Sequence, residues 1–238
     1  MKIESVAVAF PSRIVTTDEV AKEIWARSRS EFSGDLDQTI NIISRKLKAG
    51  GLETRRWLGP SESSLELTLQ ACREAITGLP DDDREIDLLI SSGVFSELIE
   101  PATANLIASK LGLNNVECFD LKEACDGWMK SAKVVEALMA TGRYHRVLVV
   151  NGEFSLSHSR TVEKLFALSS PEQLAYRFPA LTIGEAATAT VFWVDSDNSW
   201  RHSNTTRNDL YDLCIITPSW YGAHPVSPLV ASDCRCPL

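Results

Sequence analysis

Two short apolar runs, at residues 86–92 and 147–151, constrain the fold of this chain more than any other feature. Both contain consecutive Leu, Ile or Val residues, and turn-forming residues bound them. Strands that are covered on both faces have this composition, whereas a strand with one face in water alternates apolar and polar residues. The two runs therefore predict a sheet with helices on both of its faces.

Strand and helix patterns alternate around these two runs. Val, Ile and Phe content and flanking turn residues predict further strands at residues 3–10, 117–121 and 188–194. Helices are predicted where apolar residues recur every three or four positions, at residues 17–29, 37–49, 63–77, 101–111 and 125–141. This order of elements predicts an α/β layered fold, mostly parallel, with a late antiparallel strand.

The composition indicates a globular chain with a substantial core. Of the 238 residues, 44% are hydrophobic and 24% are charged, which suffices for one large domain or two small ones. The net charge of −8 does not attract a phosphodiester backbone, and no Lys/Arg stripe with interleaved aromatic residues is seen. Nucleic acid is therefore not an expected partner.

The sequence shows no membrane, export or metal signal. No apolar run approaches the roughly 18 residues of a membrane span, and residues 1–10 lack the regions of a signal peptide. Most of the six cysteines are then expected to be buried, reduced thiols of a cytoplasmic protein. Cys234 and Cys236 lack the second ligand pair that zinc requires, so neither a metal nor another cofactor is expected.

The segment CFDLKEACDGW, at residues 118–128, carries the strongest chemical signal. A strand runs into a tight turn, and the turn runs into a predicted helix whose first residue is Cys125. A thiol at a helix N-terminus faces unpaired N–H groups and the positive end of the helix dipole, which stabilise the nucleophilic thiolate. The same groups can hold the oxyanion of a thioester under attack. On spacing alone, a buried cysteine that only happens to begin a helix is the alternative.

Four segments, in order and at compatible spacing, resemble the 3-oxoacyl-ACP synthase III family of thiolase-fold condensing enzymes. IDLLI at residues 86–90 matches an IDLI strand, and PATA followed by LGL within residues 101–113 matches a helix that ends in LG(I/L). Residues 119–128 match FD(V/L)xxACxG(F/W), which is the family's active-site segment. IGEAATA at residues 183–189 matches (F/I)GDGAGA. Each motif alone would be weak evidence, but the four motifs in this order are specific to the family.

The resemblance implies a thiolase-like layered α-β-α fold, with residues 1–195 as the N-terminal half and residues 196–238 as the start of a C-terminal half. It also implies an acyltransferase. An acyl group passes from acyl-CoA or acyl-ACP to Cys125 and then condenses with malonyl-ACP by a decarboxylative Claisen reaction, in fatty acid or polyketide biosynthesis. The implied partners are acyl-CoA, an acyl carrier protein, and a second copy of the chain or another condensing subunit, paired through residues 117–121.

The resemblance also points to further site residues. Glu100 precedes Pro101 as in relatives that join two long acyl chains, in which this glutamate reaches the neighbouring subunit's site as a base. An exposed loop glutamate is the alternative. Arg55 and Trp57 lie near the family's CoA-binding turn, although they are not aligned with its Trp and Arg, and are the candidates for substrate binding. Arg55 with its neighbour Arg56, or else residues 45–48, would supply the basic patch that an acidic carrier protein needs.

The chain departs from the family in its last part. The catalytic His and Asn motifs of the family, HQAN and GNTS, are not found, and residues 222–238 show no periodicity. We expect a C-terminal half that is truncated or frameshifted. The alternative function is therefore a catalytically incomplete fragment or a non-catalytic partner subunit of a condensing enzyme. A thioesterase or an ester-forming acyltransferase, which would still use Cys125, is a third interpretation.

Overall fold

The computed structural model describes residues 1–80, 84–94, 96–158, 166–197 and 200–209. The chain forms two compact units, each made of separate segments. The first unit comprises residues 1–13, 56–155 and 185–203, and the second comprises residues 14–55 and 156–184 with the chain from residue 204. The expected division at residue 195 stays a prediction.

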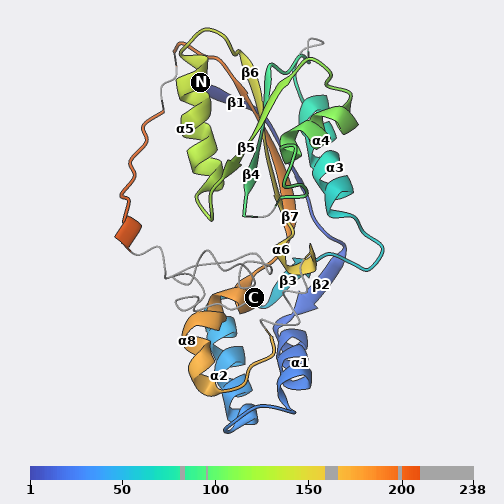
Figure 1. Ribbon diagram of the computed structural model, residues 1–238, viewed down its shortest axis with the longest axis vertical. Coiled ribbons are helices and arrows are strands. Elements are labelled where there is room, and N and C mark those ends of the chain that lie inside the picture. Colours follow the sequence, from blue (N-terminus) through green and yellow to red (C-terminus); the bar gives the residue numbers. More distant parts are fainter. Residues whose placement is uncertain (81–83, 95, 159–165, 198–199, 210–238) are drawn as a thin grey trace. The chain divides into compact units, whose positions relative to one another are not determined.

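The first unit is built on a five-stranded sheet with the strand order β1-β7-β6-β4-β5. Its strands are β1 (Lys2–Ala9), β4 (Leu88–Gly93), β5 (Glu117–Lys122), β6 (Arg146–Glu153) and β7 (Ala186–Trp193). Its helices are α3 (Ser64–Thr77), α4 (Thr103–Leu111) and α5 (Gly127–Met139). Figure 1 shows α3 and α4 on one face of the sheet and α5 on the other. The expected α-β-α layering is therefore confirmed in this unit.

Strand directions follow the sequence pattern. β5, β4 and β6 run parallel, and β7 runs antiparallel to both of its neighbours, so the late antiparallel strand is confirmed. Ser91 of β4 lies opposite Asp120 of β5 and Val150 of β6. The C-terminal ends of the three parallel strands therefore meet at one end of the sheet.

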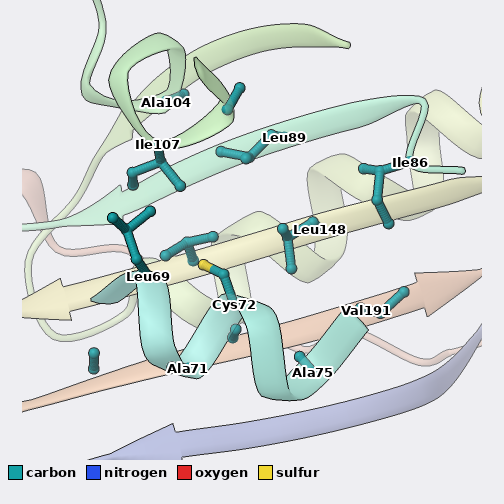
Figure 2. Close-up of a cluster of buried hydrophobic side chains, with 14 of the residues drawn as sticks. Leu69, Ala71, Cys72, Ala75, Ile86, Leu89, Ala104, Ile107, Leu148 and Val191 are labelled. Atoms are coloured by element: carbon teal, nitrogen blue, oxygen red, sulfur yellow. The ribbon is translucent and has the colours of Figure 1, made fainter. Parts of the chain in front are cut away.

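Successive side chains of the central strands enter two different cores, as the pleat of a strand requires. On one face, α3 and α4 pack against Leu89, Leu148 and Val191. On the other face, α5 packs against Leu88 and Ile90 and the side chains beside them on β6 and β7. In Figure 2 the labelled side chains of α3 point toward the sheet, with the Cys72 sulfur among them. The two apolar runs are continuous because both of their faces are buried.

A buried ion pair ties the edge strand β1 to β6 across β7. The register of β1 shifts between Ile3 and Ser5, and the intervening Glu4 accepts a 2.9 Å hydrogen bond from Nε of Arg146. The Arg146 guanidinium also lies 4.3 Å from the ring centroid of Trp193 on β7. Because a buried charge is costly without its partner, a shifted β1 that parted this pair would be disfavoured.

β1 leaves a row of apolar side chains exposed. Val6 and Val8 lie opposite Thr190 and Thr188 of β7, and so share one face of the sheet with them. Val6 and Val8 are 56% and 41% exposed, and Phe10, the residue after the strand, is 59% exposed. This face also carries α5, because Trp128 of α5 donates to Thr190. The described part of the chain thus leaves an apolar strip beside α5 in contact with solvent.

The second unit is mainly helical. Its elements are α1 (Thr17–Ser28), α2 (Leu36–Ala49), the 3₁₀ turns η1 (Pro171–Gln173) and η2 (Phe178–Thr182), and α8 (Leu174–Arg177). The short strands β2 (Arg13–Thr16) and β3 (Thr54–Trp57) form a sheet of their own, and α6 (Ser155–His158) follows β6. The sequence did not predict β2 and β3, because four residues are too few for a periodicity to show. None of the described helices is long and apolar enough to cross a membrane.

The N-terminus of α4 is capped from a neighbouring strand. Its N-cap residue, Ala102, has no side chain that could accept a hydrogen bond. The carboxylate of Asp120 on β5 accepts instead from the backbone N–H groups of Thr103 at 2.7 Å and Ala104 at 2.9 Å. This carboxylate satisfies two of the donors that a helix leaves unpaired and also lies at the positive end of the helix dipole.

Replacing Asp120 should therefore destabilise the chain. We expect Asp120→Ala to lower the free energy of unfolding by about 1–2 kcal/mol, measured by urea denaturation. Asp126→Ala is the matched control, because the Asp126 side chain caps no helix, and it should stay within about 0.5 kcal/mol of the wild type. Equal losses in both variants would contradict the capping role.

Candidate active site

Cys125 lies in the turn that joins β5 to α5, and its side chain is exposed. The helix begins at Gly127 with Asp126 as its N-cap, so the prediction that Cys125 is the first helical residue is wrong by two positions. The physical reason is the turn itself, because the N–H of Gly127 donates to the carbonyl of Ala124 at 3.1 Å and closes a loop around Cys125. The thiol therefore precedes the helix on an exposed turn.

Side-chain contacts hold this turn on both sides of Cys125. Glu123 accepts from the N–H of Ala124 at 3.2 Å and pairs with Lys130 of α5. The hydrogen bond from Lys130 holds the pKa of Glu123 below its ordinary value. Trp128 donates from Nε1 to Oγ1 of Thr190 on β7 at 3.0 Å, which fixes the first turn of α5 over the sheet.

The first turn of α5 sits directly on the end of β4. A Cβ atom at position 127 would lie 2.8 Å from Oγ of Ser92, so only glycine allows this approach. Asn151 of β6 donates from Nδ2 to the carbonyl oxygen of Ser92 at 2.9 Å. Within the described residues, Oγ of Ser92 and Oδ1 of Asn151 are buried without a hydrogen-bond partner. The first turn of α5 therefore packs against the polar residues Ser92 and Asn151.

Two charged side chains flank the backbone that leaves β4. Glu153 of β6 accepts from the N–H of Val94 at 3.2 Å, and Lys122 of β5 donates to the carbonyl of Val94 at 2.8 Å. Burial raises the pKa of Glu153, and the opposing influences of the Val94 N–H and of Lys122 are smaller. Burial also lowers the pKa of Lys122, against the opposing influence of Asp120 and Glu153. Of the two side chains, Glu153 is partly buried and Lys122 is exposed.

The structure places the other predicted residues apart from one another. Glu100 is exposed in the loop between β4 and α4. Arg55 is buried, donating to Oγ1 of Thr17 at 3.0 Å and to the carbonyl of Leu181 at 3.1 Å. Trp57 is buried too, with the Arg13 guanidinium 5.5 Å from its ring centroid. Their parts in substrate binding and in base catalysis stay predictions.

One sequence-based expectation about charge is wrong. Arg55 cannot form a surface basic patch with Arg56, because its guanidinium is spent on contacts inside the chain. Arg56 is itself bonded to the carbonyls of Pro11 and Ser12. The alternative patch on α2 fits better, since Arg45, Lys46 and Lys48 are all exposed.

Sequence reasoning missed the polar residues beneath the turn, namely Ser92, Lys122, Asn151 and Glu153. A usable signal was present, because each ends or follows an apolar strand, and ligands of parallel α/β sheets bind at the C-terminal ends of the strands. In the described part of the chain, no group of His, Cys, Asp or Glu is arranged to hold a metal ion. Cys214, Cys234 and Cys236 lie outside the described residues.

The cysteines of the described chain should differ sharply in reactivity. Burial raises the pKa of Cys72 to about 12, and burial also raises that of Cys118, whereas Cys125 is exposed. We expect iodoacetamide at pH 8 to alkylate Cys125 at least about 10-fold faster than Cys118 or Cys72. Peptide mass spectrometry gives the rates, and denaturant should remove the difference. Equal rates in the folded chain would contradict the exposure of Cys125.

Glu153 should make stability depend on pH. Its pKa is raised in the folded chain, so folding is most favoured when the carboxyl is protonated, and stability is lost as the pH rises through the folded pKa. Glu153→Gln should therefore raise the midpoint of thermal unfolding at pH 7, and the gain should vanish below about pH 4. Glu100→Gln, at an exposed site, serves as the control and should change nothing. A lower midpoint for Glu153→Gln at pH 7 would refute the desolvation argument.

Comparisons with known sequences agree with this geometry. Residues 119–206 match the 3-Oxoacyl-[acyl-carrier-protein (ACP)] synthase III family. The beta-ketoacyl-[acyl-carrier-protein] synthase III of Acholeplasma laidlawii is 29% identical over 213 residues, which are 87% of this chain and 63% of that protein. Its counterpart in Aliarcobacter butzleri is 35% identical over 209 residues, which are 87% and 58% of the two chains. This chain thus spans about 60% of the length of these relatives.

Comparisons with solved structures agree with the fold. Xanthomonas campestris OleA with bound cerulenin superposes with a TM-score of 0.64 at 22% identity, over 79% of this chain and 55% of that one. For 3-oxoacyl-[acyl-carrier-protein] synthase III from Aquifex aeolicus the TM-score is 0.62 at 21% identity, over 82% and 54%. These likenesses show the fold, which is that of thiolase-like condensing enzymes. With the sequence matches, which include the Cys125 turn, the chain is similar to the 3-oxoacyl-[acyl-carrier-protein] synthase III family over most of its length.

Proposed function

We propose that Cys125 accepts an acyl group from acyl-CoA or acyl-ACP, as the first step of a 3-oxoacyl-ACP synthase III reaction. The observation that carries this proposal is the place of the thiol. Cys125 is exposed on the turn ahead of α5, at the end of the sheet where the parallel strands terminate. The similarity to the 3-oxoacyl-[acyl-carrier-protein] synthase III family supplies the substrate class.

The first step needs a nucleophile and an oxyanion site. The Cys125 thiolate attacks the thioester carbonyl, a new carbon–sulfur bond forms, and the tetrahedral intermediate expels the CoA or carrier thiol, which takes up the proton that Cys125 lost. Backbone N–H groups at the N-terminus of α5 are suited to stabilise the negative oxygen of that intermediate. The contacts of Glu123, Lys130 and Trp128 hold the turn in place while the charge develops.

The second step joins the acyl group to malonyl-ACP. Decarboxylation of malonyl-ACP gives a carbanion, which attacks the acyl thioester and releases the Cys125 thiolate with a 3-oxoacyl-ACP product. In the family, His and Asn donors stabilise the enolate. The matched relatives extend well beyond the part that this chain spans, so the complete condensation is proposed only together with such donors.

A second candidate is a catalytically incomplete or non-catalytic subunit that works with another condensing polypeptide. The exposed Val6 and Val8 of β1, with Phe10 just after the strand, favour it, because an apolar strip of this kind marks a surface that another layer covers. The two candidates differ in one measurable property, which is whether Cys125 becomes acylated.

Partners follow from the same proposal. OleA, a structural neighbour, has been solved with bound lauric acid and lauroyl-CoA, which agrees with acyl-CoA as the donor. The exposed cations Arg45, Lys46 and Lys48 of α2 suit an acidic carrier protein. β5 is an edge strand of the described sheet, and we propose that it pairs with another subunit in a dimer. The reaction would take place in the cytoplasm, with Glu100 serving the neighbouring subunit's site.

The test is direct. The full chain is incubated with lauroyl-CoA, and the Cys125 peptide is analysed by mass spectrometry. We expect an acyl adduct on Cys125 and release of free CoA in equal amount, because one thioester replaces another. Cys125→Ser should lose the adduct, with a fall in CoA release of at least about 100-fold.

The controls separate the two candidates. Cys118→Ser should leave the adduct unchanged, because Cys118 is partly buried on β5. An adduct without 3-oxoacyl product on addition of malonyl-ACP supports acyl loading by a chain that lacks the second step. The enzyme proposal fails if the wild-type chain takes up no acyl group.

A further inference from the structure

Val94 is the first residue after β4, and side chains from the two flanking strands bind both its backbone N–H and its backbone carbonyl. The N–H of Val94 donates to Oε1 of Glu153 at 3.2 Å. The carbonyl of Val94 accepts from Nζ of Lys122 at 2.8 Å, and the same ammonium donates to Oγ of Ser96 at 2.8 Å. Glu153 belongs to β6 and Lys122 to β5, so the two neighbours of β4 hold its exit between them. This pair is called the β4 clamp below.

Glycine at position 93 makes the clamp possible. Its φ of 154° is a conformation that other residues rarely adopt. A Cβ atom there would lie 2.5 Å from Oε1 of Glu153, so the carboxylate occupies the space that any side chain would need. Gly93 also lies opposite Lys122 in the parallel register. Both members of the clamp therefore bind the backbone of the same residue, Val94.

The clamp adjoins the nucleophile turn. Lys122 is the last residue of β5, three positions before Cys125 along the chain. The backbone nitrogen of Gly93 lies 3.7 Å from the Cβ position of Gly127, the first residue of α5. The polypeptide that leaves the clamp continues to Glu100, and on the way Ser64 donates to Glu97 at 2.6 Å. The clamp therefore links the start of the loop that contains Glu100 to β5, the strand that precedes Cys125.

The clamp contains a carboxylate, that of Glu153, although burial disfavours its ionised form. Burial raises the pKa of Glu153 and lowers that of Lys122, so each ionised group is disfavoured by its surroundings. The compensating charges are the clamp partner and Asp120 of β5. Lys122 is exposed to solvent, so the cost falls on the partly buried Glu153, for which a neutral side chain of the same shape would be less costly. An arrangement that weakens the fold beside a nucleophile points to a role in function.

We propose that Lys122 and Glu153 are positioning residues, which hold the exit of β4 against the Cys125 turn and so shape the site for the incoming acyl group. This inference rests on the proposed function. It assigns the pair no contact with the reacting atoms. The clamp should therefore affect the transfer of a large acyl donor and leave the intrinsic reactivity of the Cys125 thiol nearly unchanged.

The experiment compares five variants of the full chain: Lys122→Met, Lys122→Arg, Glu153→Gln, the double variant Lys122→Met/Glu153→Gln, and the control Lys110→Met. Lys110 is an exposed residue near the end of α4. For each variant, one measures the rate of Cys125 acylation by lauroyl-CoA, the rate of its alkylation by iodoacetamide, and the midpoint of thermal unfolding.

Lys122→Met should slow acylation by about 10-fold, because small displacements of a site cost large factors in rate. Alkylation should stay within about two-fold of the wild type. Lys122→Arg, which can still donate to two acceptors, should recover most of the acylation rate. Glu153→Gln should slow acylation by about three-fold, since a charge-assisted hydrogen bond is lost, while it raises the unfolding midpoint. The double variant should be no slower than Lys122→Met, because both residues act through one clamp.

The opposite signs of rate and stability for Glu153→Gln are a result that a purely structural role would not give. The inference is overturned if acylation of Lys122→Met stays within about two-fold of the wild type. It is also overturned if alkylation falls in parallel with acylation, or if Lys110→Met is equally slow.

A wild-type chain that takes up no acyl group would defeat the proposed function, and amide hydrogen exchange then decides the inference alone. The peptide that contains Val94 should exchange at least about 10-fold faster in Lys122→Met than in Lys110→Met. Equal exchange in the two variants would reject the clamp.

Discussion

The parallel register of β5, β4 and β6 is the constraint on which the rest of the first unit depends. Parallel strands end on the same side, so the polar residues that terminate each apolar run are brought together. Ser92 comes from β4, Lys122 from β5, and Asn151 and Glu153 from β6. The turn that carries Cys125 leaves from this same end. A shift of one residue in any of these strands would exchange its two faces and separate the group.

The sheet is stabilised by buried apolar side chains, whereas the site at its C-terminal end contains buried polar groups that lower stability. Both faces of the central strands are dry, and the Arg146–Glu4 pair holds the edge strand in one register. At the C-terminal end, by contrast, Ser92 and Asn151 carry buried atoms that have no hydrogen-bond partner among the described residues, and burial raises the pKa of Glu153. Such polar groups weaken a fold, and they persist where they serve a site. Ser92, Asn151 and Glu153 lie at the end of the sheet from which the Cys125 turn leaves.

Much of the fold was predictable, and the reason is local. Continuous runs of Leu, Ile and Val identified β4 and β6 because both of their faces are covered, and three- to four-residue spacing identified α3 and α5. The four-residue strands β2 and β3 were not predicted, because a segment of four residues is too short to show an alternation of apolar and polar residues. The start of α5 was misplaced because a hydrogen bond from Gly127 to Ala124 closes a turn before the helix begins. Arg55 was assigned to a surface basic patch because of its charge, but its side chain is buried.

The sequence by itself determined the layered α/β class, the order of its elements, the family that the chain resembles and the cysteine to which the chemistry points, because each of these depends on residues close together along the chain. Only the tertiary structure decided which residues surround that cysteine's turn. Lys122 and Glu153 are far apart in sequence, and nothing near either one reveals that both bind the backbone of Val94. Hydrogen bonds between strands depend on register and direction, and these are set by how the whole sheet buries its two faces.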